Sequence, residues 1–231
     1  MIHPLPSVEM ACAPWRLSGI VYGTLLNHRP ALAALGEAVN AAPYKAAPVA
    51  PVLYQKPRNT LAGDGAQVIV PADADELELG AALGIVIART ACKLSAVQAP
   101  DYVAGYVALA DLCVPHESLY RPSLRFRARD GFCVLAPAVT LRAAVPDPDA
   151  LAVRVFVDGE VVQQSTTGER IRDVARLLVD VTDFMTLAAG DILMLGVPAG
   201  APRVRAGQKA TIAIGGLAPL NLSFAAEGEA Q

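Results

Sequence analysis

Hydrophobic and polar residues alternate on both sides of Asp158-Gly159, in the segment LAVRVFVDGEVVQQS (151–165). Alternation gives a strand one apolar and one polar face, and Asp-Gly is a preferred two-residue hairpin turn. After this segment the spacing of apolar residues changes. Over 171–184 they recur every three or four residues, and Gly190 follows. This half of the chain therefore predicts a β-hairpin and then an amphipathic helix.

Short apolar runs between glycines and prolines fill the rest of the chain. The longest, 79–88, predicts a buried strand. Pro30 predicts the start of a helix over 30–41, because proline is tolerated in a first helical turn, and 95–104 is predicted as a further helix. The other predicted strands are 18–26, 66–70, 106–109, 191–195, 210–214 and 220–224. The pattern indicates a β-rich α+β fold with a few short helices.

Neither a repeat nor a linker-like stretch divides the chain. We therefore expect one domain over 18–225, an N-terminal extension over 1–17 and a C-terminal tail over 226–231.

A content of 54% hydrophobic and 18% charged residues excludes a disordered protein. The net charge of −3 favours neither nucleic acid nor an anionic membrane as a partner, and the longest apolar run is about half a membrane span.

The cysteines lie far apart and form no Cys-x-x-Cys pair, which disfavours a zinc site or a disulfide framework. The first residues show no positive cluster ahead of an apolar stretch, unlike a signal peptide. We expect free thiols and a cytoplasmic protein. The cysteines are Cys12, Cys92, Cys113 and Cys133.

Four stretches together resemble the fumarylacetoacetate hydrolase family. They are YQKPRNTLAGDGAQVIVP (54–71), GIVIARTACKLSAVQAPDYVAGYVALADL (84–112), RDGFCVLAPAV (129–139) and the run from Thr167 through DFMTLAAGDILMLGVPAG (183–200). Five shorter segments are similar to one branch, the N-terminal half or separate subunit of the isomerase/decarboxylase of homoprotocatechuate (4-hydroxyphenylacetate) degradation. These segments are 25–32, 42–46, 56–60, 117–122 and 129–133.

The resemblance implies a β-sandwich roll that binds Mg²⁺ or Mn²⁺ and acts on 2-oxo acids or their enols. For this branch it implies decarboxylation of 5-oxopent-3-ene-1,2,5-tricarboxylate and isomerisation of 2-hydroxyhepta-2,4-diene-1,7-dioate. It also implies a homologous C-terminal-type subunit, a second copy of the chain, or both as partners. A divalent cation at the keto oxygen would stabilise the enolate.

The chain departs from the family at the metal site. The two carboxylates of the family's Glu-x-Glu fall on Gly80 and Ala82, and only the third position, Asp111, is acidic. One carboxylate holds Mg²⁺ poorly, because the ion gives up water reluctantly. Glu76 and Glu78 also share one face of a strand, but we interpret them as part of a solvated acidic loop.

Other family positions change as well. Ala31 stands where hydrolytic members have a histidine, and His28 takes a tyrosine position three residues earlier. Pro115 replaces an arginine and Val197 a threonine. Arg127 replaces a lysine, which keeps the charge but cannot act as a base near neutral pH.

The candidate catalytic residues are Asp111, Glu117 and Arg127, with Asp111 also the weak metal ligand. Buried Asp111 could equally form a structural ion pair with an arginine. If the run RPSLRFRARD (121–130) is extended, Arg125, Arg127 and Arg129 share one face, as an anion clamp or as a cationic strand edge. The candidate substrate-binding residues are Lys56, Arg58, Arg121 and Arg129, although Lys56 and Arg58 could simply occupy an exposed turn.

Two functions stay open. The chain is an enzyme subunit whose electrophile is supplied by cationic side chains or by a metal-bearing partner, or it is a non-catalytic partner of such a subunit. A third alternative, an acylpyruvate-type hydrolase, is disfavoured by Ala31 and by the missing carboxylates.

Overall fold

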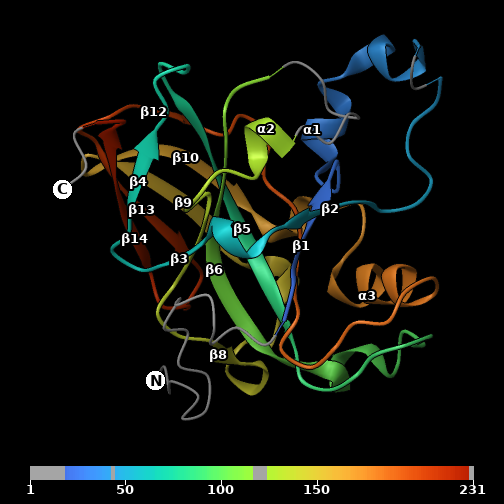
Figure 1. Cartoon of the computed structure of the whole chain (residues 1–231). Helices are drawn as coiled ribbons and strands as arrows, with labels where there is room; N and C mark the ends of the chain where they lie inside the picture. Colours follow the sequence, from blue (N-terminus) through green and yellow to red (C-terminus); the bar gives the residue numbers. More distant parts are fainter. Residues whose placement is uncertain (1–18, 43–44, 117–123, 229–231) are drawn as a thin grey trace.

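The computed structural model describes residues 19–42, 45–116 and 124–228. Within them, fourteen strands and three short α-helices form a β-rich fold (Figure 1). The strands are β1 (Val21–Leu25), β2 (Val52–Lys56), β3 (Leu61–Gly63), β4 (Gln67–Val70), β5 (Leu77–Ile87), β6 (Val103–Cys113), β7 (Cys133–Leu135), β8 (Thr140–Leu141), β9 (Ala152–Val157), β10 (Glu160–Thr166), β11 (Ile192–Met194), β12 (Arg203–Val204), β13 (Lys209–Ile214) and β14 (Leu220–Ala226). The α-helices are α1 (Arg29–Ala33), α2 (Leu124–Arg127) and α3 (Val174–Thr182). The 3-10 helices are η1 (Gly36–Asn40), η2 (Arg58–Thr60), η3 (Ala99–Tyr102), η4 (Arg142–Ala144), η5 (Pro148–Ala150) and η6 (Thr167–Glu169).

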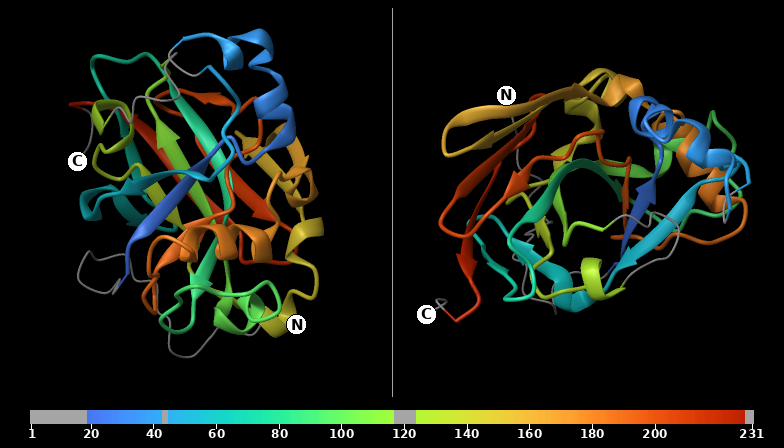
Figure 2. Two further views of the ribbon diagram at one scale, coloured as in Figure 1. Left: turned by 90° about the vertical axis from the view of Figure 1, so that its right-hand side faces the viewer. Right: turned by 90° about the horizontal axis from the view of Figure 1, so that it is seen from above.

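The strands form two sheets. The larger runs β2-β1-β11-β5-β6-β7-β3, with β12 added to β5 and β8 to β6, and the smaller runs β10-β9-β13-β14-β4. Seen from above, the strands curl around the core as a roll (Figure 2, right). At the centre, β5 and β6 pair antiparallel along almost their whole length. Both strands are buried nearly throughout, which explains their continuous apolar sequence. The β-rich roll is therefore confirmed.

The hairpin predicted around Asp158-Gly159 is present as β9 and β10. Both turn residues have positive φ, 51° for Asp158 and 87° for Gly159, and this geometry explains why that pair stands there. Helix α3 follows and buries its apolar stripe. Its first turn is capped by Asp173, whose carboxylate accepts the Arg176 N–H at 2.7 Å. The helix is shorter than the predicted 171–184.

Two helix predictions fail in part. The segment 30–41 is split into α1 and η1, and Gly36 at the break has a φ of 49°. Residues 95–104 do not form one helix, because only η3 is helical and β6 starts at Val103. The Gln98 side chain accepts the Ser95 N–H, as in a helix N-terminal cap, but Pro100 lacks the N–H that would continue the helix.

The arginine-rich run is not extended where it is described. Residues Leu124–Arg127 form α2, a single helical turn, so the three arginines at 125, 127 and 129 do not share a strand face. Among the described residues, no helix has both the length and the apolar character to cross a bilayer, since the longest α-helix, α3, has nine residues.

Candidate active site

A cavity of about 310 Å³ opens beside the central strands, between β1, β2, α2 and the turn after β11. Its wall combines an apolar part with several ionisable groups. Because these groups come from segments far apart in the sequence, the fold and not local spacing assembles them. The ionisable side chains in the described lining are Tyr54, Glu78, Asp111, Cys113, Arg127 and Arg203.

Asp111 lies on β6 at the centre of this group and is 3% exposed. Its Oδ1 is 2.7 Å from the Nζ of Lys56, and its Oδ2 accepts a hydrogen bond from Arg127 Nη1 at 3.4 Å. The Tyr54 hydroxyl also donates to Oδ2. Tyr54 and Lys56 are two residues apart on β2, so their side chains point from the same face toward Asp111.

These contacts keep Asp111 ionised. Burial alone would raise the pKa of its carboxyl, but the charges of Lys56 and Arg127 outweigh burial and hold the pKa below its ordinary value. Burial and the nearby Asp111 charge raise the pKa of Tyr54 well above its usual range, so Tyr54 remains a hydrogen-bond donor. Lys56 Nζ also faces the carbonyl oxygens of Leu112 and Arg127, each at 3.1 Å. All three ammonium protons therefore have oxygen neighbours.

Glu78 is the second carboxylate of the cavity. The solvated-loop interpretation is wrong for this residue, since Glu78 lies on β5 and only 31% of its side chain is exposed. The Cys113 thiol donates to Oε2 at 3.2 Å, and Arg203 Nη2 lies 3.1 Å from Oε1. Burial raises the pKa of the Cys113 thiol to about 12, so this group stays protonated.

The structure separates the three arginines of the possible clamp. Arg127 turns to Asp111, whereas Arg125 and Arg129 both bond to Asp73 at 2.9 Å. Hydrogen bonds from Arg129 and Arg125 lower the pKa of exposed Asp73 to about 2. This second cluster ties α2 to the loop before β5.

Lys56, Asp111 and Arg127 are thus brought together, and two other predicted residues are not with them. Arg58 is exposed in η2, and neither Arg58 nor Arg129 belongs to the described lining of the cavity. Glu117 and Arg121 lie outside the described residues.

Sequence reasoning missed Tyr54 and Arg203 in the cavity, and it considered Glu78 but assigned it to a solvated loop. For Tyr54 there was a signal, because a residue two positions before Lys56 on a strand shares its face. Arg203 pairs with Glu78 across β12 and β5, which depends on a long-range strand pairing that spacing alone does not reveal.

The described residues do not fit a Mg²⁺ or Mn²⁺ site. Gly80 is opposite Asp111 in the β5–β6 register, and a Cβ added there would come within 2.8 Å of the Asp111 carbonyl oxygen and 2.8 Å of a Val197 methyl. Ala82 is fully buried. The described residues contain no group of three or more His, Cys, Asp or Glu placed to hold a metal ion. The one carboxylate at a family ligand position is already paired with two cations.

The β-rich roll is the fold that the resemblance to the fumarylacetoacetate hydrolases implied. The chain belongs to this family: the model described as "Fumarylacetoacetate (FAA) hydrolase C-terminal" matches residues 20–224. Over 204 residues the chain is 33% identical to the 4-hydroxyphenylacetate degradation bifunctional isomerase/decarboxylase of Escherichia coli. The match covers 88% of this chain and 46% of that protein, so the chain spans about half the length of the curated relatives it matches.

Solved structures agree with this assignment. The 2-hydroxyhepta-2,4-diene-1,7-dioate isomerase from Mycobacterium marinum superposes with a TM-score of 0.75 at 26% identity, over 92% of this chain and 77% of that one. A fumarylpyruvate hydrolase from Pseudomonas aeruginosa, solved with Mn²⁺ and pyruvate, has a TM-score of 0.77 at 23% identity, over 90% and 89% of the two chains. That second likeness concerns the fold.

Proposed function

We propose that the chain is one unit of an isomerase/decarboxylase that acts on 2-oxo or enol di- and tricarboxylates in aromatic catabolism. The observation that carries this proposal is the position of Arg127. Its guanidinium lines the cavity and donates one hydrogen bond, from Nη1 to Asp111; no other hydrogen bond joins it to a described residue. A planar guanidinium with free N–H groups suits a substrate carboxylate. Similarity to a bifunctional isomerase/decarboxylase and to a dienedioate isomerase supports the substrate class.

In the proposed decarboxylation of 5-oxopent-3-ene-1,2,5-tricarboxylate, a carboxylate leaves as CO₂ and its bonding electrons remain as a dienolate. Arg127 binds a carboxylate and stabilises the developing negative charge. Asp111 holds this guanidinium in place, and Lys56 donates to the backbone carbonyl oxygen of Arg127. Glu117 and Arg121 remain predicted contributors to catalysis and substrate binding.

In the proposed isomerisation of 2-hydroxyhepta-2,4-diene-1,7-dioate, the 2-hydroxyl proton leaves and its bonding pair forms the C2 carbonyl. The diene electrons then leave one C3=C4 double bond, and C5 receives a proton. Asp111 is held ionised by its cations, so it is a poor proton carrier near neutral pH. Glu78 is the more open carboxylate of the cavity and is the group we assign to this proton transfer.

Turnover by the purified chain tests the proposal. The ultraviolet absorbance of 2-hydroxyhepta-2,4-diene-1,7-dioate is followed with excess Mg²⁺ and, separately, with a chelator. We expect loss of the dienol signal at the same rate in both. Loss that requires Mg²⁺ would contradict the cation-based mechanism, and no loss in either condition would contradict the isomerase assignment.

A second candidate is a non-catalytic partner of a metal-bearing homologous unit. The crowding at Gly80 favours it, because the family's ligand position cannot accept a carboxylate without a shift of its neighbours. Oxalate, a dicarboxylate analogue of the enol, distinguishes the two candidates. Metal-free oxalate binding that collapses in Arg127→Ala supports a working site. Undetectable binding, together with tight association to a metal-containing homologue, supports the partner role.

A further inference from the structure

One wall of the cavity is a turn rather than a strand. Residues 197–200 follow β11, and Val197, Pro198 and Gly200 all line the cavity. The Val197 methyl groups lie 2.8 and 2.9 Å from the point where a Cβ on Gly80 would stand. The position of this turn therefore sets the space beside Gly80 and Asp111.

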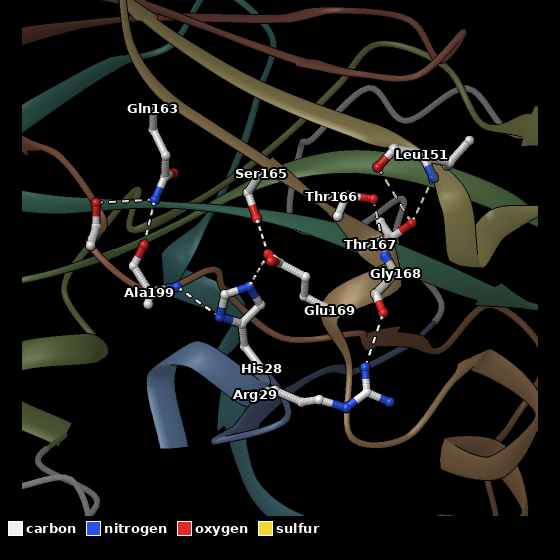
Figure 3. Close-up of polar contacts among 11 residues, drawn as sticks. His28, Arg29, Leu151, Gln163, Ser165, Thr166, Thr167, Gly168, Glu169 and Ala199 are labelled. Atoms are coloured by element: carbon white, nitrogen blue, oxygen red, sulfur yellow. Dashed lines mark hydrogen bonds and ion pairs between the residues drawn. The ribbon is translucent and has the colours of Figure 1, made fainter. Parts of the chain in front are cut away.

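Side chains from two distant segments hold the turn (Figure 3). The Ala199 N–H donates to Nδ1 of His28 at 3.1 Å. From the other side, Gln163 Nε2 donates to the carbonyl oxygens of Ala199 and Gly200 at 2.9 and 3.0 Å. One backbone N–H and two carbonyl oxygens of the turn are thus bonded to side chains outside it.

The contacts of His28 define its protonation. A nitrogen that accepts a backbone N–H carries no proton, so Nδ1 is bare and Nε2 carries the hydrogen. Nε2 lies 3.1 Å from Oε2 of Glu169, which accepts that hydrogen. Glu169 also accepts a weaker bond from Ser165 at 3.4 Å (Figure 3).

The surroundings favour this neutral form. His28 is 3% exposed, and burial first and then the charge of Arg170 lower its pKa below the ordinary value of 6.5. Glu169 acts in the opposite direction. Arg29, the next residue, directs its Nη1 to the Gly168 carbonyl oxygen.

We infer that His28 is a positioning residue of the candidate active site: through the Ala199 N–H it holds the 197–200 turn against Gly80 and Asp111. His28 itself does not belong to the described lining of the cavity. A proton on Nδ1 would turn the acceptor into a donor and release the turn. The inference rests on the proposed function for one point, that the cavity binds a carboxylate.

Three variants test the inference. His28→Leu removes the acceptor, whereas His28→Asn places an amide oxygen near the position of Nδ1. Glu169→Gln keeps an acceptor for Nε2 and serves as the matched control. The first measurement is amide hydrogen exchange of the peptides that cover 197–200, at neutral pH. We expect exchange about tenfold faster in His28→Leu, the effect of one lost hydrogen bond, and near wild-type exchange in the other two.

The second measurement is oxalate binding at pH 7.5 and pH 5. His28→Leu should bind about tenfold more weakly at pH 7.5, the effect of one lost hydrogen bond. Wild-type affinity should fall at pH 5 by more than that of His28→Asn, whose amide does not titrate.

Equal exchange in His28→Leu and the wild type would overturn the inference. If His28→Leu does not fold, His28→Asn decides: an acid loss of affinity equal to that of the wild type would also overturn it. Wild-type protein that does not bind oxalate would overturn the proposed function, and the exchange measurement would still decide the role of His28.

Discussion

Two cations are buried among the described residues, and their surroundings differ completely. Lys56, 2% exposed, has three oxygens within 3.1 Å of its ammonium nitrogen. Arg170, 3% exposed, has no hydrogen-bond partner for any guanidinium nitrogen among the described residues. Burial lowers the pKa of Arg170 to about 10, against the opposing charges of Glu169 and Asp149. A buried charge contributes to stability only where its partners offset the cost of desolvation. Lys56, next to the cavity, has such partners, and Arg170 does not.

The largest expected effect on this comparison comes from Lys56→Met, which removes the cation that has partners. It leaves the Asp111 carboxylate buried without its closest cation, and loss of one partner from a buried pair costs about 3–5 kcal/mol. Urea unfolding should show this decrease in the free energy of unfolding. Arg58→Met, at an exposed position in η2, is the matched control and should change stability by less than about 0.5 kcal/mol. A loss below about 1 kcal/mol for Lys56→Met would show that Arg127 and Tyr54 suffice for Asp111.

The comparison extends to the two carboxylates of the cavity, since Asp111 pairs with two cations and Glu78 with one. Glu78→Gln removes the proposed proton carrier, and dienol isomerisation should fall about 100-fold or more, the usual size of a general acid–base contribution. Glu76 also pairs with Arg203 but lies outside the described lining of the cavity, so Glu76→Gln is the control. Equal rates in the two variants would refute the assignment of Glu78.

Arg170→Met tests the buried cation whose guanidinium has no hydrogen-bond partner among the described residues. Removal of a buried charge that lacks hydrogen-bond partners should raise the free energy of unfolding by about 1–2 kcal/mol. Thermal unfolding at neutral pH measures the gain. A decrease in stability would mean that the charges of Glu169 and Asp149 outweigh the burial of the guanidinium.

The smallest expected effect is acid sensitivity from His28. Its pKa is lowered in the folded protein, so the unfolded chain binds the proton more tightly and stability falls as the pH drops below about 6.5. Between pH 7.5 and 5, the free energy of unfolding should decrease less in His28→Asn than in the wild type. The two decreases should differ by about 1 kcal/mol or less. Parallel urea titrations at the two pH values measure this difference. Identical losses would show that His28 does not titrate in this range.

Much of the fold was predictable because its signals are local. The Asp158-Gly159 hairpin and the stripe of α3 each depend on a few consecutive residues, and both predictions are confirmed. The 95–104 prediction is wrong in part because Pro100 lacks a backbone N–H and the chain from Val103 pairs with β5 instead of continuing as a helix. Whether such a segment ends as a helix or joins a sheet depends on the folded conformation, which the spacing of residues does not reveal.

The candidate site was predictable only in part. The position of Asp111 after an apolar run predicted burial, and burial predicted a partner. Its closest cation, Lys56, comes from β2, a strand that is not adjacent to β6 in the sheet, so no residue spacing identifies it. For His28, an acceptor role at a backbone amide 171 residues away leaves no trace in the sequence.

The contact between Val197 and the space at Gly80 also dictates an order of mutations. A carboxylate introduced at position 80 alone would meet both the Val197 side chain and the Asp111 backbone. Reduction of residue 197 to alanine first would open the side-chain half of that space at the cost of a small cavity. The two positions are therefore epistatic, and a designer who wishes to install a metal centre here should change residue 197 before residue 80.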